Sequence, residues 1–143
     1  MLATDGNGLP IGLVVASASP HEVTLAQETL RTIAVPQKRG RPRTRPRELV
    51  ADKAYDSRAF RTWLKGRGIK AVIPHFERRA RKKPKRGRPF AEPTLIYKSR
   101  WKVERTFAWL QNYRRLEIRR ERLLTTFRAF VRVACCLILL KHF

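Results

Sequence analysis

Two carboxylates, Asp52 and Glu104, are the side chains of this 143-residue sequence best placed to carry chemistry. Acidic residues are scarce, with 11 Asp and Glu against 33 Lys and Arg, and these two lie inside otherwise apolar stretches. Asp52 ends the stretch 48–52, and ligand-handling residues of α/β sheets gather at the carboxyl ends of strands. Because Mg²⁺ prefers one or two carboxylates together with phosphate oxygens, the pair is a candidate site for metal-assisted phosphodiester chemistry.

Three side chains of different chemistry share one face of a predicted helix. Tyr97, Arg100 and Glu104 stand at i, i+3 and i+7, within about 60° of one another at about 100° per residue. A guanidinium and a phenol beside a carboxylate can hold a phosphate. Structural interpretations remain open as well. Asp52 can cap the turn that follows it, and Glu104 can pair with a neighbouring Lys or Arg on the surface.

The formal net charge of +22 indicates a polyanionic partner, because a compact body with this charge repels itself. Nucleic acid is favoured over an anionic membrane surface. A composition of 43% apolar residues can form a core, which excludes a wholly disordered basic tail. The charge is concentrated in two loops, predicted over about residues 36–47 and 78–93, where Pro and Gly disfavour regular helix. The candidate DNA-binding residues in these loops are Arg41, Arg43 and Arg86, whose guanidinium groups suit phosphate.

A hairpin and a helix are predicted for the first part of the chain. The turn signal Asp5-Gly6-Asn7-Gly8 separates residues 1–4 from the strand-like stretch 9–16. Ser19, followed by Pro20 and then by Glu22, is typical of a capping box, which predicts a helix over about 20–34.

The middle of the chain predicts a β-α-β unit, which has parallel strands. Its strands are expected over 48–52 and 70–74, with a helix between them that is capped by Asp56 or Ser57 and ends at about Lys65.

Two further helices, over about 97–115 and 123–141, are expected to complete the core. In the first of them, Val103, Phe107 and Leu110 form an apolar stripe at helical spacing.

The adjacent Cys135 and Cys136 are predicted to be buried core thiols, because a vicinal pair fits neither a disulfide framework nor a metal-ligand spacing. Their apolar run, 133–140, is far shorter than the roughly 20 residues needed to cross a bilayer. Residues 1–10 carry no signal-peptide pattern, so a cytoplasmic location and no membrane partner are predicted.

Several segments resemble the two C-terminal catalytic blocks of DDE transposases from bacterial insertion sequences, in the insertion sequence 5 group of the larger insertion sequence 4 superfamily. The first is 51–57 (ADKAYDS), and the second is 97–110 (YKSRWKVERTFAWL) followed by 113–116 (YRRL). The hairpin turn 5–10 (DGNGLP) also resembles a segment of that family, so the similarity covers nearly the whole chain.

The resemblance implies an α/β fold with an RNase H-like core, in which three carboxylates hold two Mg²⁺ ions for strand cleavage and transfer at transposon ends. Asp52 matches the second of these catalytic, metal-binding carboxylates, and Glu104 matches the third. Tyr97 and Arg100 match the tyrosine and arginine that precede the family's glutamate. The DNA-binding candidates near the carboxylates are Tyr97, Arg100, Lys53 and Arg105.

The sequence departs from the family pattern at three places. The family's first aspartate lies on the first core strand, ahead of the hairpin, and has no counterpart here; Asp5 does not replace it, because turn chemistry explains that residue. Gln111 stands where the family usually has lysine, and Ala54 where it often has glycine. Residues 1–143 are therefore expected to form one partial RNase H-like catalytic domain (hairpin, helix, β-α-β unit and two C-terminal helices) without the first core strand.

Three functions follow as hypotheses. The favoured one is the C-terminal part of a DDE transposase, a remnant or a separately read second frame, which binds transposon-end DNA and is inactive alone. A second is a working enzyme that obtains its missing carboxylate from an upstream transposase polypeptide, with a homo-oligomer as a further possible assembly. The third is a general basic nucleic-acid-binding protein without catalysis. The spacing of Tyr97, Arg100 and Glu104 argues against the third, because charge alone does not require it.

Overall fold

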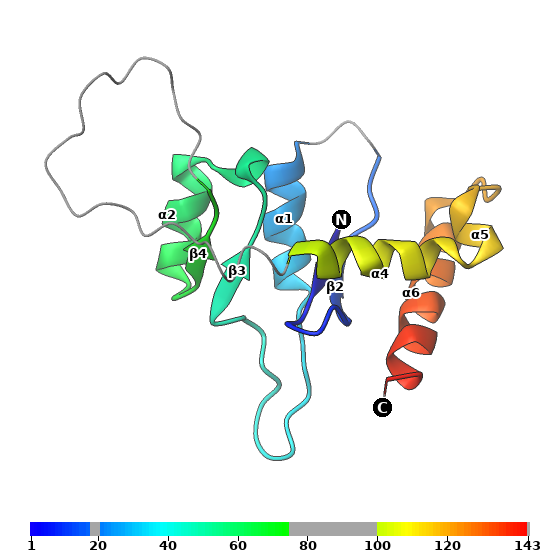
Figure 1. The fold of residues 1–143 in the computed structure, drawn as a ribbon, viewed down its shortest axis with the longest axis horizontal. Coiled ribbons are helices and arrows are strands. Elements are labelled where there is room, and N and C mark those ends of the chain that lie inside the picture. Colours follow the sequence, from blue (N-terminus) through cyan, green and yellow to red (C-terminus); the bar gives the residue numbers. More distant parts are fainter. Residues whose placement is uncertain (18–20, 75–99, 143) are drawn as a thin grey trace, which may run out of the picture. The chain divides into compact units, whose positions relative to one another are not determined.

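The computed structural model describes residues 1–17, 21–74 and 100–142. The chain divides into two compact units, one made of Met1–Arg45 with Trp101–Phe143 and the other of Pro46–Arg100. Each unit combines helices with a two-stranded sheet, in agreement with the expected α/β class (Figure 1).

The first unit begins with the predicted hairpin. Strand β1 (Leu2–Thr4) pairs in antiparallel fashion with β2 (Pro10–Leu13). The carboxylate of Asp5 accepts hydrogen bonds from the backbone N–H groups of Asn7 and Leu9, at 2.8 Å each. This geometry confirms that Asp5 serves the turn, as its position in the sequence predicts.

Helix α1 (Glu22–Arg31) starts later than the sequence predicts. Its N-cap is His21, which makes no capping hydrogen bond through its side chain, and the carbonyl of His21 accepts from the N–H of Thr24 at 3.0 Å. Ser19 and Pro20 lie outside the described residues. Because Glu22 is the first residue of the helix, it cannot be the third residue of a capping box that starts at Ser19, so that prediction was wrong.

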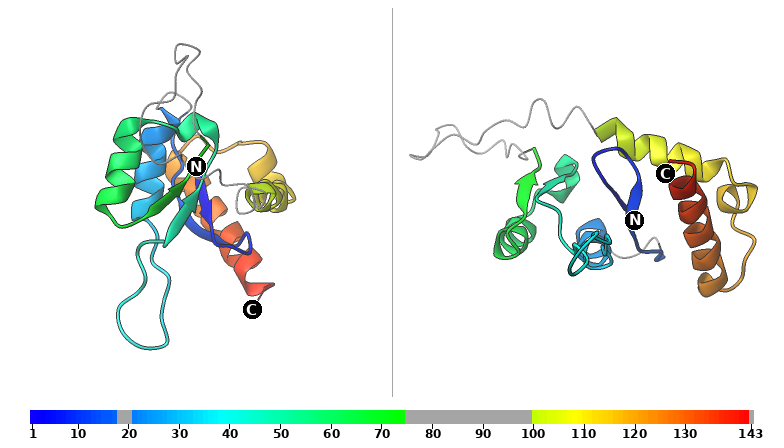
Figure 2. Two further views of the ribbon diagram at one scale, coloured as in Figure 1. Left: turned by 60° about the vertical axis from the view of Figure 1, so that its left-hand side comes forward. Right: turned by 90° about the horizontal axis from the view of Figure 1, so that it is seen from below.

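Close packing of α1 on the hairpin explains a glycine in β2. A Cβ atom at Gly12 would lie only 2.9 Å from the carbonyl oxygen of Thr29 and 3.0 Å from the side chain of Ile33. The hydroxyl of Thr32 accepts a hydrogen bond from the N–H of Leu13 at 3.1 Å. The hairpin lies between α1 and α6 (Leu124–Leu140), and both helices contact it (Figure 2, right).

In its described part, the predicted helix over 97–115 is broken. Helix α4 spans Trp101–Gln111, and a separate short helix, α5, spans Arg114–Glu117. Tyr113 between them has an extended backbone, with φ −90° and ψ 107°. Propensity favours a continuous helix, but the break allows Tyr113 and Leu116 to pack against the core. The buried residues of that core are Leu2, Leu110, Ala134 and Ile138.

The buried face of α4 also differs from the predicted stripe. Leu110 is buried, but Phe107 is 45% exposed and its place in the interior is taken by Thr106, which is fully buried. A polar residue is tolerated there because its hydroxyl has hydrogen-bond partners, the carbonyl oxygens of Gly8 and Lys102.

The second unit is the predicted β-α-β arrangement. Strands β3 (Glu48–Val50) and β4 (Lys70–Val72) are parallel, with Leu49 opposite Ala71. Between them lie a short 3-10 helix, η1 (Lys53–Tyr55), and helix α2 (Arg58–Gly66). The hydroxyl of Ser57 accepts from the N–H of Phe60, so Ser57 is the cap of α2. Among the described residues of this unit, the buried apolar ones are Phe60, Leu64, Ile69, Val72 and Ile73.

The two cysteines are less buried than predicted. Cys135 is half-buried and Cys136 is exposed, both as free thiols on α6, because successive residues of a helix point to different sides. Burial, together with the neighbouring Cys136, raises the pKa of the Cys135 thiol to about 11. Within the described ranges, we find no helix with the length and apolar character needed to cross a membrane.

Candidate active-site carboxylates and nucleic-acid-binding surfaces

Asp52 is predicted to end the strand 48–52, but β3 ends at Val50 and Asp52 follows it. Both carboxylate oxygens of Asp52 have partners. Oδ1 accepts from the backbone N–H of Lys53 at 2.6 Å, which makes Asp52 the cap of η1. Oδ2 lies 2.8 Å from Nη1 of Arg100. The Asp52 side chain is 46% exposed and that of Arg100 is 41% exposed, so the pair is accessible from solvent. The capping role of Asp52 and its availability to a ligand are therefore compatible.

Arg100 connects two parts of the sequence that both carry predicted site residues. It stands 48 residues after Asp52, and both belong to the second unit. A guanidinium that holds a carboxylate at a strand end can also donate to phosphate oxygens, because it has five N–H groups. Tyr97 lies outside the described residues, and α4 begins only at Trp101, so the predicted face shared by Tyr97, Arg100 and Glu104 stays a prediction.

A second ion pair supports the segment that carries Asp52. Nε of Arg61 lies 2.6 Å from Oδ1 of Asp56, and Nη2 of Arg61 donates to the carbonyl oxygen of Ile73 at 2.7 Å. These bonds tie the start of α2 to the segment just after β4. Arg61 and Asp56 are only 23% and 12% exposed, so the pair is poorly screened by water. Arg61 is therefore a positioning residue for the end of the parallel sheet.

We expect Arg61→Ala to lower the free energy of unfolding by about 1.5–3 kcal/mol, because it removes a charged hydrogen bond and leaves Asp56 without this partner. Urea unfolding of the whole chain measures the change. The matched control is Lys70→Ala, which breaks the exposed ion pair between Lys70 and Glu48 and should cost about 1 kcal/mol or less. Equal losses in the two variants would contradict a positioning role for Arg61.

Glu104 lies in the first unit, on the first turn of α4, and is exposed. A carboxylate at this position interacts favourably with the helix dipole. In the ranges that the structure describes, no group of three or more His, Cys, Asp or Glu side chains is arranged to hold a metal ion. Metal binding by Asp52 and Glu104 thus remains a hypothesis from their chemistry and their motifs.

The first two turns of α4 hold the turn of the hairpin, an interaction that sequence reasoning missed. Side chains of Lys102, Arg105 and Thr106 donate to the carbonyl oxygens of Gly6, Asn7 and Gly8, respectively. Gly8 has φ +85°, and a Cβ atom there would lie 3.0 Å from the guanidinium of Arg105. Only glycine adopts this backbone conformation without strain, so the turn sequence and α4 are matched to each other.

Arg105 is also enclosed by aromatic rings. Its guanidinium carbon lies 4.9 Å from the ring centre of Trp101 and 4.7 Å from that of Trp109. Both are cation–π distances. The spacing of Trp101, Arg105 and Trp109, at i, i+4 and i+8, was the available signal for this stack. Arg105 therefore has a structural role, and its contact with DNA stays a prediction.

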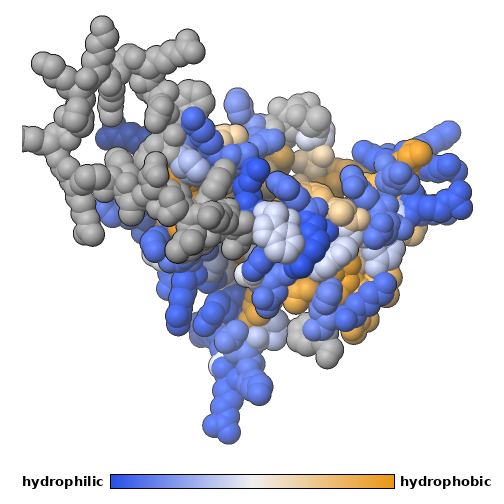
Figure 3. Space-filling view, viewed as in Figure 1, coloured by the Kyte–Doolittle hydropathy of each residue, from blue (hydrophilic) through white to orange (hydrophobic). Residues whose placement is uncertain are grey.

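The other predicted DNA-binding residues lie on exposed loops or outside the described residues. Lys53 is exposed on η1, and Arg41 and Arg43 are exposed on the first basic loop. Hydrophilic side chains cover the tip of that loop at the bottom of Figure 3. Arg86 and the whole predicted loop 78–93 lie outside the described residues.

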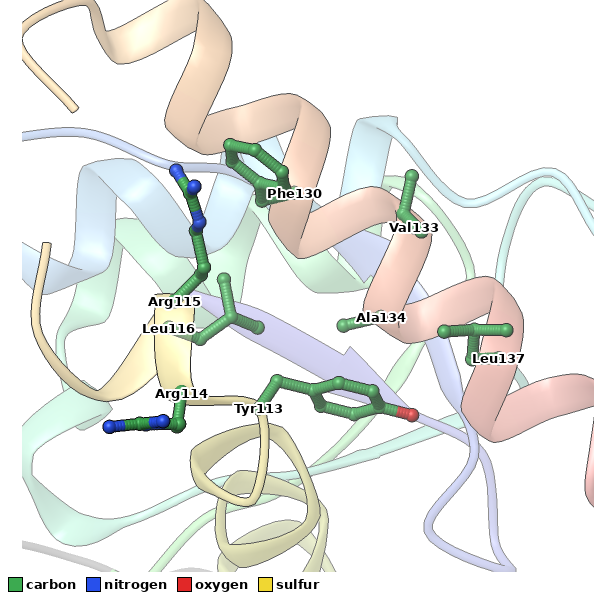
Figure 4. A pocket seen from close by; sticks show the side chains of 8 residues that line it. All are labelled: Tyr113, Arg114, Arg115, Leu116, Phe130, Val133, Ala134 and Leu137. Atoms are coloured by element: carbon green, nitrogen blue, oxygen red, sulfur yellow. The ribbon is translucent and has the colours of Figure 1, made fainter. Parts of the chain in front are cut away.

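A shallow apolar cavity of about 220 Å³ lies between α5 and α6. Figure 4 shows Tyr113 and Leu116 directed toward Ala134 and Leu137 of α6, while Arg114 points away from that helix. The guanidinium of Arg115 stacks on the ring of Phe130, with its carbon 5.2 Å from the ring centre. The polar groups among its lining residues are the Tyr113 hydroxyl and the guanidinium groups of Arg114 and Arg115, and the other lining residues are apolar.

Comparison with known proteins identifies similar sequences. Residues 1–139 match the family model described as "Transposase DDE domain". The chain is 38% identical over 138 residues to a transposase for insertion sequence element IS402 of Burkholderia cepacia, covering 96% of this chain and 60% of that protein. It is 33% identical over 96 residues to a transposase for IS6501 of Brucella ovis, covering 65% of this chain and 67% of that protein. No solved structure matches the chain significantly.

Proposed function

Because the chain belongs to the family of transposases with a DDE domain, we propose that it acts in DNA transposition and supplies two carboxylates of a metal-dependent strand cleavage and transfer site. These carboxylates are Asp52 and Glu104. The chain spans about 60% of the length of the Burkholderia relative. The motif resemblance matches two carboxylates within residues 1–143, and the proposal places the first carboxylate of the site outside these residues. The ion pair of Asp52 with Arg100 is the observation that carries the proposal, because it joins residues from the two separate motifs at the end of a parallel strand.

We extend the proposal to the fold and the domain organisation. We propose an RNase H-like core over residues 1–143 whose first strand is not supplied by these residues, and its described strands are the hairpin β1–β2 and the parallel pair β3–β4. Isolated two-stranded sheets are marginally stable, and their unpaired edges can accept another strand. A strand supplied by the rest of a transposase would pair with such an edge. The assignment to the insertion sequence 5 group rests on the motif resemblance.

The residues of the chain have different proposed roles at the site. Asp52 presents its carboxylate at the strand end, held by Lys53 N–H and by Arg100. Arg100 can donate to the phosphate that is to be cleaved and stabilise the charge that develops on it. Carboxylates are the ligands that Mg²⁺ prefers, and a bound Mg²⁺ pair would activate the attacking hydroxyl and stabilise the leaving oxygen. The predicted roles of Tyr97 and Lys53 are to hold the DNA backbone.

The alternative function is a general nucleic-acid-binding protein in which both carboxylates are structural. The capping bond from Lys53 to Asp52 favours this alternative, because it gives Asp52 a role that needs no metal. The two functions differ in whether Asp52 and Glu104 hold the same ion.

Iron-directed backbone cleavage separates the two functions. When Fe²⁺ replaces Mg²⁺ in the presence of DNA, ascorbate and peroxide, radicals formed at the bound ion should cut the chain near both residue 52 and residue 104. Asp52→Asn keeps an oxygen acceptor for the capping bond but loses the charge, and it should remove both sets of cuts, as should Glu104→Gln. Glu48→Gln, which changes an exposed carboxylate in the same unit, is the control and should leave the cuts in place. Loss of cuts at the substituted position alone, or no cuts at either position, would favour the alternative.

A further inference from the structure

The loop that joins α1 to β3 is a closed hairpin with an arginine-rich tip. The N–H and C=O groups of Val35 and Arg43 bond to each other in both directions, at 2.9 and 2.8 Å, and enclose residues 36–42. Arg39, Gly40 and Arg41 are the middle of this enclosed segment and are called its tip here. The segment is part of the cyan loop at the bottom of Figure 1. Gly40 has φ +88°, and nothing lies within 4 Å of the place a Cβ atom would occupy. The tip is therefore narrow and open around Gly40.

The charges of this tip are available to a ligand. Every side chain from Pro36 to Arg45 is exposed, and no Asp or Glu occurs between residues 36 and 47. Within the described part of the chain, neither Arg39 nor Arg41 takes part in an ion pair. The bridge at Val35 and the fixed φ of Pro36 and Pro42 restrict the loop, which lowers the entropy cost of binding.

Two guanidinium groups on either side of a glycine fit the minor groove of DNA. This arrangement suits a contact with the groove better than a contact with the phosphate backbone alone. That groove is only about 6 Å wide, so the missing side chain of Gly40 allows the backbone to approach its floor. A·T-rich tracts have a narrower groove with a more negative potential, which attracts arginine. The acceptors there are adenine N3 and thymine O2, and a guanidinium can only donate. Guanine instead adds an amino donor, which opposes the contact.

We propose that the tip Arg39-Gly40-Arg41 inserts into the minor groove of A·T-rich duplex DNA and gives the chain a base-composition preference. The five residues Lys38 to Pro42 (KRGRP) recur in the sequence at 85–89, so the chain carries this short pattern twice. The proposal rests on the DNA binding in the proposed function and is independent of Asp52 and Glu104.

Binding of the whole chain to three duplexes of equal length and identical flanks tests the proposal. Their central six base pairs are A·T, G·C or inosine·C, and inosine lacks only the amino group that guanine places in the minor groove. We expect the A·T and inosine·C duplexes to bind about equally, and at least about threefold more tightly than the G·C duplex. Arg39→Lys with Arg41→Lys keeps the net charge but not the weakly hydrated planar group, and should at least halve the preference while leaving the dependence on salt unchanged. Arg114→Lys with Arg120→Lys, at two exposed arginines outside the loop, is the matched control and should keep the preference.

Three results would overturn the proposal: binding to G·C at least as tight as to A·T, inosine·C behaving like G·C, or an unchanged preference in the Arg39→Lys, Arg41→Lys variant. Salt-dependent binding with no base preference would remove this inference and leave the proposed function intact. Failure to bind any DNA would remove both.

Discussion

The purified 143-residue chain is expected neither to nick nor to join transposon-end DNA in the presence of Mg²⁺ or Mn²⁺. In the proposed function, Asp52 and Glu104 supply two of three carboxylates, and no residue of 1–143 is proposed for the first. Two divalent ions repel each other strongly, so a site that lacks one of three carboxylates should lose at least one ion. Arg100 can stabilise phosphate charge but cannot generate a nucleophile, so it does not replace the missing ligand. Gel analysis of a labelled end substrate measures the cleavage.

A positive control is needed for this expectation. We expect cleavage to appear when the part of the Burkholderia relative that the chain does not cover is added, and to fall by about 10³-fold or more with Asp52→Asn or Glu104→Gln, because a metal ligand contributes several kcal/mol. Glu48→Gln should retain the cleavage. Metal-dependent cleavage by the chain alone that either variant abolishes would contradict the expectation, and would assign a third ligand to another carboxylate such as Asp56.

The affinity of the chain for duplex DNA should fall by about 10³–10⁵ between 50 and 200 mM salt, if about six to ten phosphates are contacted. The two predicted basic loops hold 14 Lys and Arg, six in residues 38–47 and eight in 78–88, and counterion release should therefore supply most of the binding free energy. A fluorescence titration at several salt concentrations measures the slope. Base composition should modulate this affinity by a much smaller factor.

Neutralising the first loop provides the matched comparison. Arg43→Gln with Arg47→Gln should reduce the slope of log affinity against log salt by up to about 1 for each phosphate that the variant no longer binds. Lys65→Gln, at an exposed lysine at the end of α2, should leave the slope unchanged. Nearly salt-independent binding would show that the loops do not contact phosphate.

Elements with strong local signals were predictable from the sequence. The turn at Asp5 joins the two strands of the predicted hairpin, and Ser57 is the cap of α2. The β-α-β unit has parallel strands close to the expected residues. Helix α6 begins and ends within one residue of its prediction. In each case the deciding interactions lie within a few residues of the element, so composition and spacing contain the information.

The errors occur where contacts between distant segments decide the structure. Tyr113 breaks a stretch with no Pro or Gly, because it packs against a core that includes Leu2. Thr106 replaces Phe107 in the interior because the hairpin turn supplies a hydrogen-bond acceptor for its hydroxyl. Such pairings join residues nearly 100 positions apart, and a helical pattern cannot show them.

The sequence predicts which residues belong to the candidate site, but it does not predict the contacts between them. Its place at the end of the predicted strand 48–52 and its motif both indicate Asp52, and the cap that it forms is one of the structural interpretations that the sequence leaves open. Its ion pair with Arg100 does not follow from the sequence, because helical spacing places Arg100 on one face with Glu104. The stack of Trp101, Arg105 and Trp109 is indicated by their i, i+4, i+8 spacing on a helix. The charge of Arg105, taken alone, indicates a contact with DNA instead.

The central claim is that Asp52 and Glu104 are ligands of one catalytic metal site. The most direct test substitutes each carboxylate ligand and also replaces Mg²⁺ by another metal ion. In the cleavage-competent mixture, Asp52→Cys and Glu104→Cys replace an oxygen ligand by a softer sulfur, which binds Mg²⁺ poorly and is better accommodated by Mn²⁺. We predict that each variant is inactive with Mg²⁺ and that Mn²⁺ restores at least about a tenth of the cleavage rate seen with Asp52 and Glu104 intact. Activity that stays near normal with Mg²⁺, or an equal loss with both ions, would contradict the claim.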